Sequence, residues 1–331
     1  MPLQPVGVLG TGAHVPKSEI TNDDLARRVG VTPEWILRKT GIETRRYAAE
    51  DEATSDLAVR AAEAALDSAG ISALDVDHLI VATSTGDHPQ PPTAHLVQHR
   101  LGARRAAAFD INVVCSGFVH GLALARGLIA TRPGTRALVV AADLYSRVLD
   151  FDDRRTAVLL GDGAGAAVVG EVPEGAGIVD VELRSKGEAS RLIRVEAGGS
   201  RLPTSPATLA EGGQYFRMEG RDVRDFVLEQ VPPAVADLLA RTGTGPADVD
   251  HLVPHQPNGP MLADLADALA LPSAKVHRTL DRYGNIGSAS LPVTLDAAAR
   301  AGEFAAGDLL LLCAFGGGMS MASCLLRWST P

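Results

Sequence analysis

The sequence predicts an α/β protein made of two similar halves. The pentapeptide DVDHL occurs at residues 75–79 and again at 248–252, an offset of 173 residues. The same offset aligns the segment that begins at Cys115 with the one that begins at Ser288, and each has the pattern of a helix, a short turn and a buried strand. One offset shared by two segments indicates a duplicated unit. Helices between apolar strands indicate mixed sheets buried beneath helices.

The neighbouring elements extend the repeat. An Ala/Leu-rich helical segment precedes each copy of DVDHL, at 61–70 and at 233–243, and an apolar strand follows each copy. A stretch rich in Gly, Pro and Ser, from about 171 to 213, separates the two regions. We therefore expect an N-terminal half at 1–172 and a C-terminal half at 173–331.

The composition is that of an ordinary globular protein. Of 331 residues, 46% are hydrophobic and 21% are charged, which argues against disordered and fibrous classes. The 40 acidic and 31 basic side chains give a formal net charge of −9, and aromatic residues make up 4%. Nucleic-acid binders are usually basic and carry aromatic residues that stack on bases. We therefore expect no nucleic-acid partner.

Cysteine usage and the N-terminus favour a cytoplasmic location. Cys115, Cys313 and Cys324 are an odd number of cysteines in a long chain, which argues against a disulfide framework. The first residues, MPLQPVGVLGTGAHVP, lack the basic and long apolar regions of a signal peptide. His251 and His255 are four residues apart with no third ligand nearby, so we expect no metal site.

One segment needs to be tested as a membrane span. Residues 309–326 carry no charge over 18 positions. Three consecutive glycines in its middle would make a poor helix, and the segment is better interpreted as strand, turn and strand. We therefore expect a soluble, cytoplasmic protein that is not associated with a membrane.

Cys115 is the first candidate for chemistry. It lies between an extended, β-branched run and an amphipathic helix in FDINVVCSGFVHGLALARG (109–127). The unpaired N–H groups and the positive dipole end at a helix N-terminus stabilise a thiolate. Most cysteines in apolar surroundings are inert packing residues, and Cys313 and Cys324 fit that description. The position of Cys115 between a strand and a helix instead favours exposure at the edge of the sheet where α/β active sites gather.

Two polar residues occupy related places in the second half. His255 follows an apolar strand in HLVPHQPNG (251–259), and the Pro-Asn-Gly that comes after it indicates a strand end or loop. Asn285 lies in RYGNIGSAS (282–290), near the place that corresponds to Cys115 under the repeat. A lone asparagine in a turn usually serves the turn itself. In a two-fold arrangement of halves, however, both residues could face the same pocket as Cys115.

Three glycine-rich strings are weaker signals. GVLGTGAH (7–14) has the wrong spacing for a dinucleotide fingerprint. LGDGAGAAVVG (160–170) leads into a strand, which argues against phosphate binding. AFGGGMS (314–320) could present a bare backbone N–H to a ligand.

With these segments in view, the sequence resembles the β-ketoacyl-acyl-carrier-protein synthase III family of the thiolase superfamily. The resemblance covers about residues 5 to 328 and rests on an ordered series of motifs: GTGAHVP, EWILRKTGI, FDINVVCSGF, LLGDGAGAAVV, VPHQPN, RYGNIGSAS and LLLLCAFGGG. It implies a five-layered α-β-α-β-α thiolase-like fold and a homodimer. No cofactor is implied, because acyl-CoA is a substrate.

The resemblance also implies roles for individual residues. Cys115 matches the acyl-accepting nucleophile, and His255 and Asn285 match the pair that drives decarboxylation of a malonyl thioester. The backbone N–H groups of Cys115 and Gly317 would hold the oxyanion. The remaining matches are Trp35, Lys39, Arg154 and Asn258 for CoA binding, and Gln90, Leu160 and Phe315 for the acyl pocket.

Several departures from the family pattern bear on the substrates. Lys39 stands where an Arg often contacts the CoA phosphates. Gln90 stands where a large aromatic residue often closes the acyl pocket across the dimer, so a longer or more polar acyl group is an option. The helix expected after His255 is typically basic where it docks the carrier protein, but NGPMLADLADALAL (258–271) has no basic residue and contains Asp264 and Asp267.

We therefore expect a condensing enzyme that loads an acyl group onto Cys115 and joins it to a malonyl thioester in secondary-metabolite biosynthesis. One alternative is acyl transfer from Cys115 to a hydroxyl or amine without decarboxylation. Another is a non-enzymatic partner subunit, which the intact Cys/His/Asn set disfavours. The sequence leaves the acyl donor, the pathway and its product open. It also leaves open whether the acceptor is a carrier protein, a CoA thioester or a small molecule.

Overall fold

The fold is built on two five-stranded mixed sheets. The structure, a computed structural model, describes residues 4–329. The first sheet has the order β1–β7–β6–β4–β5 and the second the order β12–β11–β13–β14–β8. The strands of the first sheet are β1 (Val6–His14), β4 (His78–Ala82), β5 (Ala107–Ile111), β6 (Ala137–Leu144) and β7 (Asp162–Glu171). Those of the second are β8 (Gly177–Ser185), β11 (His251–Pro254), β12 (Lys275–Val276), β13 (Leu309–Gly316) and β14 (Ser320–Arg327).

The two sheets repeat one topology. In the first sheet β5, β4 and β6 are parallel, and β7 and then β1 are added antiparallel. In the second, β12, β11 and β13 are parallel, and β14 and then β8 are added antiparallel. The helices that precede β6 and β13 begin at Gly117 and Ser290, which differ by 173 residues. The predicted duplication is therefore confirmed.

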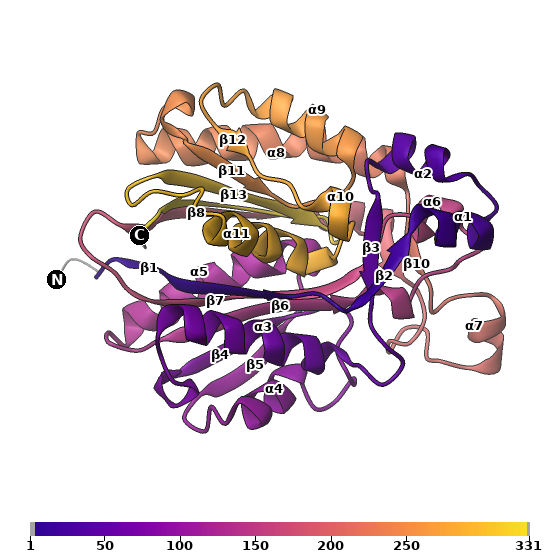
Figure 1. The fold of residues 1–331 in the computed structure, drawn as a ribbon, viewed down its shortest axis with the longest axis horizontal. Helices are drawn as coiled ribbons and strands as arrows, with labels where there is room; N and C mark the ends of the chain where they lie inside the picture. The colour runs from indigo at the N-terminus through magenta and orange to yellow at the C-terminus, as the bar shows by residue number, and fades with distance from the viewer. Residues whose placement is uncertain (1–3, 330–331) are drawn as a thin grey trace.

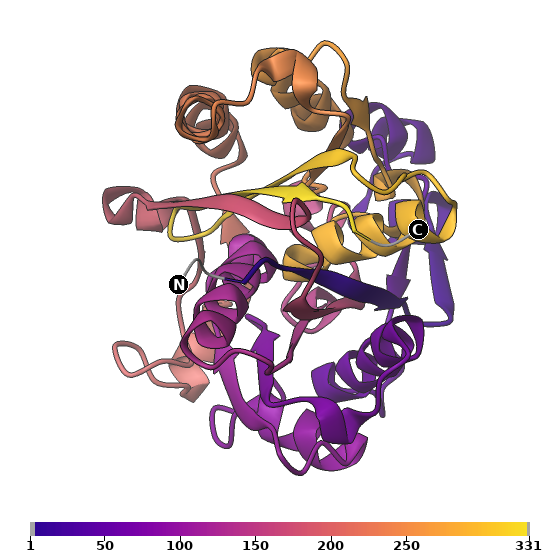
Figure 2. The same ribbon diagram turned by 90° about the vertical axis from the view of Figure 1, so that its left-hand side faces the viewer.

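Helices complete five layers, as the sequence predicts. Figure 1 shows α8 and α9 on the outside of the second sheet, α5 and α11 between the sheets, and α3 and α4 on the outside of the first sheet. Figure 2 shows the same central layer from the side. The bounds of these helices are α3 (Thr54–Ala69), α4 (Thr93–Leu101), α5 (Gly117–Thr131), α8 (Gly220–Thr242), α9 (Gly259–Leu269) and α11 (Ser290–Arg300).

Smaller elements form a cap at one end of the sheets, on the right in Figure 1. They are β2 (Ser18–Thr21), α1 (Asn22–Val29), α2 (Pro33–Thr40), β3 (Thr44–Tyr47), α6 (Arg154–Ala157), β9 (Ile193–Val195), α7 (Pro206–Ala210), β10 (Phe216–Met218) and α10 (Leu280–Tyr283). Single turns of 3-10 helix occur at Ala73–Asp75, Val114–Ser116, Tyr145–Arg147, Pro246–Asp248 and Gly287–Ala289, and a longer one at Gly187–Leu192. The cap matters for function because α2 and β10 supply residues to the cavity described below.

The stretch between the halves does more than connect them. The predicted boundary at 172/173 falls in the connection from β7 to β8, and the Gly/Pro/Ser-rich region of 171–213 was expected only to separate the halves. In the structure it contains β8, which pairs with β14 along its whole length, and β9, which pairs with β10 in the cap. The region is therefore part of the second sheet and of the cap.

The uncharged segment 309–326 forms β13, a turn and β14, as predicted, and both strands are buried. Within the described residues, the one helix long and apolar enough to cross a membrane is the window Val114–Thr131, half of which is buried. This window contains α5, whose apolar side chains pack in the core between the sheets. Its hydrophobicity is accounted for by that packing.

Glycines in two of the glycine-rich strings allow strands to pack closely against helices. A Cβ at Gly12 of β1 would lie 2.2 Å from the backbone nitrogen of Ala65, so only glycine lets β1 approach α3 so closely. A Cβ at Gly165 of β7 would lie 2.8 Å from the ring of Pro292 on α11. Both strings form strands, β1 and β7, as the sequence indicated for the second of them.

Candidate active site

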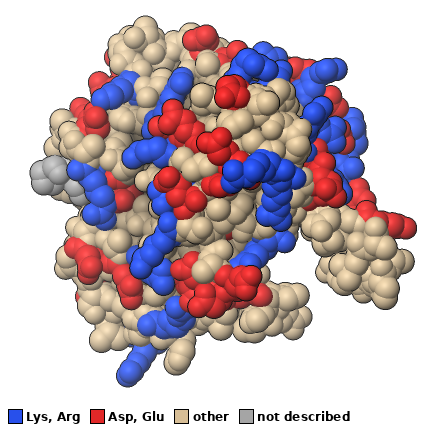
Figure 3. All heavy atoms as spheres, turned by 45° about the vertical axis from the view of Figure 1, so that its right-hand side comes forward, with Lys and Arg blue, Asp and Glu red and all other residues tan. Residues whose placement is uncertain are grey.

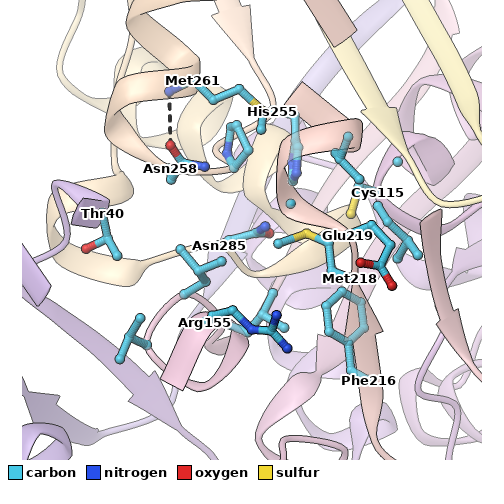
Figure 4. A pocket seen from close by; sticks show the side chains of 18 of the residues that line it. Thr40, Cys115, Arg155, Phe216, Met218, Glu219, His255, Asn258, Met261 and Asn285 are labelled. Carbon is cyan, nitrogen blue, oxygen red and sulfur yellow. Dashed lines mark hydrogen bonds between the residues drawn. The ribbon is translucent and has the colours of Figure 1, made fainter. Parts of the chain in front are cut away.

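A cavity of about 610 Å³ lies where both halves and the cap meet. Cys115, His255 and Asn285 all line it, from three separate segments of the chain, and Figure 4 shows them converging on it. The other predicted residues that line it are Trp35, Lys39, Leu160, Asn258 and Phe315. The fold thus brings together eight of the side chains singled out from the sequence.

Cys115 is held in a turn between β5 and α5. The residue before it, Val114, has a φ of +46°, a left-handed conformation that β-branched residues rarely adopt. Backbone strain of this kind clusters at active sites. The turn is tied down by Ser116, whose Oγ lies 2.7 Å from the Oγ of Ser320 on β14. The turn that holds Cys115 is therefore fixed to both sheets.

The electrostatics of Cys115 differ from the expectation. Burial raises the pKa of its thiol to about 12, and the negative charge of Asp143 adds to the increase. A backbone N–H and the hydroxyl of Tyr145 act in the opposite direction but are outweighed. The predicted lowering of the thiol pKa is therefore not what the surroundings of Cys115 produce, because desolvation outweighs the hydrogen bonds that stabilise a thiolate. At rest, Cys115 is a neutral thiol.

His255 follows β11 and is 2% exposed. Its backbone N–H donates to the carbonyl of Cys313 at 2.7 Å, which extends the β11–β13 pairing by one residue. Burial lowers the pKa of the imidazole to about 3. His255 is consequently neutral at physiological pH, and one of its ring nitrogens carries a proton that can be donated to a substrate oxygen.

Asn285 is oriented by its own backbone surroundings. Its N–H donates to the carbonyl of Leu159 and its carbonyl accepts from the N–H of Gly161, both at 2.9 Å. Its side-chain Oδ1 accepts from the N–H of Gly287 at 3.0 Å. Since the oxygen end of the amide is engaged by the turn, the NH₂ end is the one available to the cavity.

The glycine string after β13 packs directly on the nucleophile. A Cβ at Gly316 would lie 2.7 Å from the backbone nitrogen of Cys115, and Gly316 lines the cavity. Gly317, the predicted second oxyanion donor, adjoins it but is not among the lining residues, and its nearest neighbours are Ile193 and Val114. The absence of a side chain at Gly316 therefore lets the end of β13 pack directly against Cys115.

The residues predicted to bind CoA lie around α2, α6 and α9. Trp35, Lys39 and Asn258 line the cavity, and the Oδ1 of Asn258 caps α9 by accepting from the N–H of Met261 at 3.0 Å (Figure 4). Arg154 does not line it, because its guanidinium lies over the ring of Trp35 at 5.6 Å. The next residue along the chain, Arg155, lines it instead (Figure 4).

Gln90 lies outside this arrangement. It is exposed in the loop between β4 and α4, and it does not line the cavity of its own chain. Leu160 and Phe315, the other two members of the predicted acyl pocket, are buried and do line it.

Sequence reasoning missed several cavity residues. Tyr145 lines the cavity beside Cys115, and Phe216 and Met218 reach it from β10. Asp143 lies just behind Tyr145 and is fully buried. The signal that could have identified Asp143 was a carboxylate within the apolar strand ALVVAADL. A buried carboxylate requires hydrogen-bond donors or a bound proton.

The arrangement supports acyl-transfer chemistry. A thiol that lines a cavity can accept an acyl group, and neutral donors from His255 and Asn285 can stabilise an oxygen that develops negative charge. Within residues 4–329, no group of three or more His, Cys, Asp or Glu side chains gathers in a way that could hold a metal ion.

Comparisons with known proteins agree with this chemistry. Residues 109–187 match the family model described as 3-oxoacyl-[acyl-carrier-protein (ACP)] synthase III, and residues 239–328 match the model of its C-terminal part. The chain is 51% identical over 323 residues to acetoacetyl CoA synthase NphT7 of Streptomyces sp. (strain CL190), covering 97% of this chain and 98% of that protein.

Solved structures of the same family have the same fold. One is the 3-oxoacyl-(acyl carrier protein) synthase III of Pseudomonas aeruginosa PAO1, with a TM-score of 0.91, 38% identity and 99% of both chains covered. Another is the priming beta-ketosynthase from the R1128 polyketide biosynthetic pathway, with a TM-score of 0.90, 32% identity, and 100% of this chain and 99% of that chain covered. The predicted thiolase-like fold is thus confirmed, and the chain belongs to the 3-oxoacyl-[acyl-carrier-protein] synthase III family.

Proposed function

We propose that the protein loads an acyl group from acyl-CoA onto Cys115 and condenses it with malonyl-CoA to give a β-ketoacyl-CoA. Family membership makes the chain an acyl-transferring condensing enzyme. The observation that carries the residue assignments is the meeting of Cys115, His255 and Asn285 in one cavity. No cofactor takes part in the proposed reaction.

In the loading step, the sulfur of Cys115 attacks the thioester carbon of acyl-CoA, and CoA leaves as its thiol. The tetrahedral oxyanion is stabilised by the backbone N–H groups of Cys115 and Gly317. The close approach of Gly316 supports this assignment, because a side chain there would collide with the backbone nitrogen of Cys115 and displace the donor.

In the condensation step, malonyl-CoA loses CO₂ and leaves an enolate. Hydrogen bonds from the neutral imidazole of His255 and the NH₂ of Asn285 stabilise the enolate oxygen. The lowered pKa of His255 supports this role, since a neutral imidazole in a dry site avoids burying a positive charge. The carbanion attacks the acyl-cysteine, forms the new carbon–carbon bond and releases the β-ketoacyl-CoA. The sulfur of Cys115 leaves as a thiolate and takes up one proton from water to restore the thiol.

The choice of a CoA thioester as the acceptor rests on the charge of α9. Acyl carrier proteins are acidic, so a docking surface for them gains from basic residues. In α9 the charged residues are Asp264 and Asp267. On the face of the protein shown in Figure 3, basic and acidic side chains are interspersed. The printed name of the 51% identical relative, acetoacetyl CoA synthase, also gives a CoA product.

We further propose a cytoplasmic homodimer, as the family resemblance implies. In that dimer Gln90 would approach the acyl pocket of the partner subunit, which accords with its exposure in the single chain. Secondary-metabolite biosynthesis is the proposed setting, supported by the structural likeness to a polyketide priming ketosynthase.

The test is product analysis with purified protein. The protein is incubated with a panel of acyl-CoAs, starting with acetyl-CoA, and with malonyl-CoA or malonyl-carrier protein, while released CO₂ and products are followed by mass spectrometry. We expect a β-ketoacyl-CoA and one CO₂ per turnover with malonyl-CoA. Loading of Cys115 without CO₂ release would instead favour acyl transfer to a hydroxyl or amine.

A further inference from the structure

A chain of hydroxyl groups leads from Cys115 into the first half. Tyr145 and Cys115 line the same cavity, and the hydroxyl of Tyr145 acts to lower the pKa of the Cys115 thiol. The same hydroxyl lies 2.9 Å from the Oγ of Ser84. The Oγ of Ser84 in turn donates to Oδ1 of Asp143 at 2.9 Å. Tyr145 is 3% exposed and Asp143 is fully buried, so both ends of the chain are shielded from bulk solvent, whereas Ser84 is partly exposed.

Asp143 ends this chain and is held by neutral donors. Its Oδ2 accepts from the Oγ of Ser288 at 2.6 Å and from the N–H of Ser288 at 2.9 Å. Its Oδ1 also accepts from the N–H of Ser84 at 2.8 Å. Among the ion pairs of residues 4–329, none includes Asp143. Burial raises the pKa of its carboxyl, which makes it a better proton acceptor than a carboxylate in water.

We propose that Tyr145, Ser84 and Asp143 form a proton relay that takes the thiol proton of Cys115 when the acyl group is loaded. Each proton moves one place: from the sulfur to the Tyr145 oxygen, from Tyr145 to Ser84, and from Ser84 to the Asp143 carboxylate. The result is a thiolate that accepts a hydrogen bond from Tyr145, and a neutral Asp143. This inference rests on the proposed function, because it concerns the loading step.

The proton balance explains how a buried thiol can react. Loss of the proton to solvent would place two negative charges, on Cys115 and Asp143, in one buried region, and the charge on Asp143 already opposes the thiolate. Transfer to Asp143 keeps the region at a single negative charge. After the sulfur has formed its bond to the acyl carbon, the same relay returns the proton through Tyr145 to the departing CoA sulfur. Tyr145 touches the reacting atom, whereas Ser84 and Asp143 act through it as positioning residues.

The other groups that face Cys115 do not compete for this proton. His255 has a pKa lowered to about 3, so it is a weak base in the resting protein. Asn285 does not titrate. The groups that act on the thiol electrostatically or by side-chain hydrogen bonding are Asp143 and Tyr145.

The test uses alkylation of Cys115 by iodoacetamide, followed by peptide mass spectrometry across pH 6 to 8. It needs no acyl-CoA, so it gives an answer even if the proposed condensation fails. In the wild type the proton stays within the relay, and the rate is expected to vary little with pH. In Asp143→Asn the proton must leave to solvent, and the rate is expected to rise about tenfold per pH unit and to be lower at pH 7. Tyr145→Phe removes a hydrogen bond to a thiolate, which corresponds to a rate lower by about ten- to a hundredfold.

A matched pair of serines separates the relay from simple structural support. Ser84→Ala and Ser288→Ala each remove a hydroxyl that donates to Asp143, but only Ser84 lies between Asp143 and Tyr145. Ser84→Ala removes the hydroxyl through which the proton passes from Tyr145 to Asp143, and is expected to slow alkylation. Ser288→Ala weakens the charged form of Asp143 and is expected to leave the rate unchanged or increase it. A wild-type rate that rises tenfold per pH unit, equal slowing by both serine variants, or an unchanged rate in folded Tyr145→Phe would overturn the proposal. The Tyr145 and serine variants keep it testable if Asp143→Asn does not fold.

Discussion

The rings of His255 and Phe315 meet edge to face, with centroids 5.3 Å apart and an interplanar angle of 85°. This contact places the apolar ring of Phe315, in β13, against the imidazole just beyond the end of β11. Because the ring is buried against such a surface, its protonated form is disfavoured and its pKa falls to about 3. The geometry therefore keeps His255 as a neutral hydrogen-bond donor.

The lowered pKa of His255 predicts how the rate of decarboxylation depends on pH. An ordinary histidine titrates near 6.5 and would become protonated as the pH falls below that value. His255, with its pKa lowered to about 3, stays neutral throughout pH 5 to 8. We expect CO₂ release from malonyl-CoA by pre-acylated protein to show no loss with a midpoint near pH 6.5. A decline centred there in the wild type, absent from His255→Gln, would contradict the assignment.

The roles of His255 and Asn285 after loading can be separated from those of Cys115. Removal of one donor to a developing oxyanion typically lowers the rate about 100- to 1000-fold. His255→Ala and Asn285→Ala should therefore still become acylated by acyl-CoA but release CO₂ from malonyl-CoA more slowly by that factor. Intact-mass measurement follows loading, and trapping of CO₂ follows decarboxylation. Unchanged decarboxylation in both variants would move the function toward plain acyl transfer.

Cys115 should be the sole site of acylation. All three cysteines are buried, but only Cys115 lines the cavity, whereas Cys313 and Cys324 lie in the core of the second sheet and are fully covered. Cys115→Ala should abolish the mass increase on incubation with acyl-CoA. Cys313→Ala and Cys324→Ala serve as matched controls and should retain it. A persistent mass increase in the Cys115 variant would refute the assignment.

The principal site residues were predictable because they follow strands of duplicated halves. Cys115 and His255 each come shortly after a parallel strand of its sheet, and the carboxyl ends of parallel strands collect functional groups. The periodicity and turn residues of 309–326 likewise sufficed to exclude a membrane helix. In these segments, the local sequence pattern predicts the place that the residues take in the fold.

The relay residues could not be predicted in the same way. Ser84 and Ser288 reach Asp143 from 59 and 145 residues away in the chain, so no local pattern joins them. The apolar run that contains Asp143 indicates only a buried strand. Arg154 and Arg155 are neighbours in one short helix. Arg154 lies over Trp35 whereas Arg155 lines the cavity, and this difference depends on tertiary packing. The pKa of Cys115 depends on desolvation, which sequence does not reveal.

Two glycines give a matched test of the space beside the nucleophile. At Gly316 a Cβ would lie 2.7 Å from the nitrogen and 2.8 Å from the Cβ of Cys115. We expect Gly316→Ala to reduce acyl loading severely by displacing the nucleophile. Gly127, within α5, is exposed and has open space around its Cα. Gly127→Ala should leave loading intact and raise the free energy of unfolding by about 0.5–1 kcal/mol. Loading by the Gly316 variant at the wild-type rate would show that the close approach of Gly316 to Cys115 is not required for acyl loading.

The acceptor prediction depends on how the arginines near α9 are used. The alternative to a CoA acceptor is a carrier protein that docks on Arg217, Arg221 and Arg224 rather than on α9 itself. Arg224 is paired with Asp264 of α9 at 2.8 Å, and Arg217 is paired with Asp150 at 2.6 Å. Two of the three cations are therefore already engaged by acidic groups of the same chain.

Turnover should consequently favour malonyl-CoA over malonyl-carrier protein and depend little on ionic strength. Attraction between exposed charges is screened beyond about 8 Å at 0.15 M salt, so docking through free arginines would weaken steeply as salt is added. The measurement compares both malonyl donors over a salt series in the wild type and in Arg221→Glu/Arg224→Glu. Arg221 also lines the cavity, so the malonyl-CoA rate of the double variant serves as its internal reference. Efficient, salt-sensitive turnover with the carrier-bound donor, lost selectively in the double variant, would refute the CoA assignment and place the docking surface on these arginines.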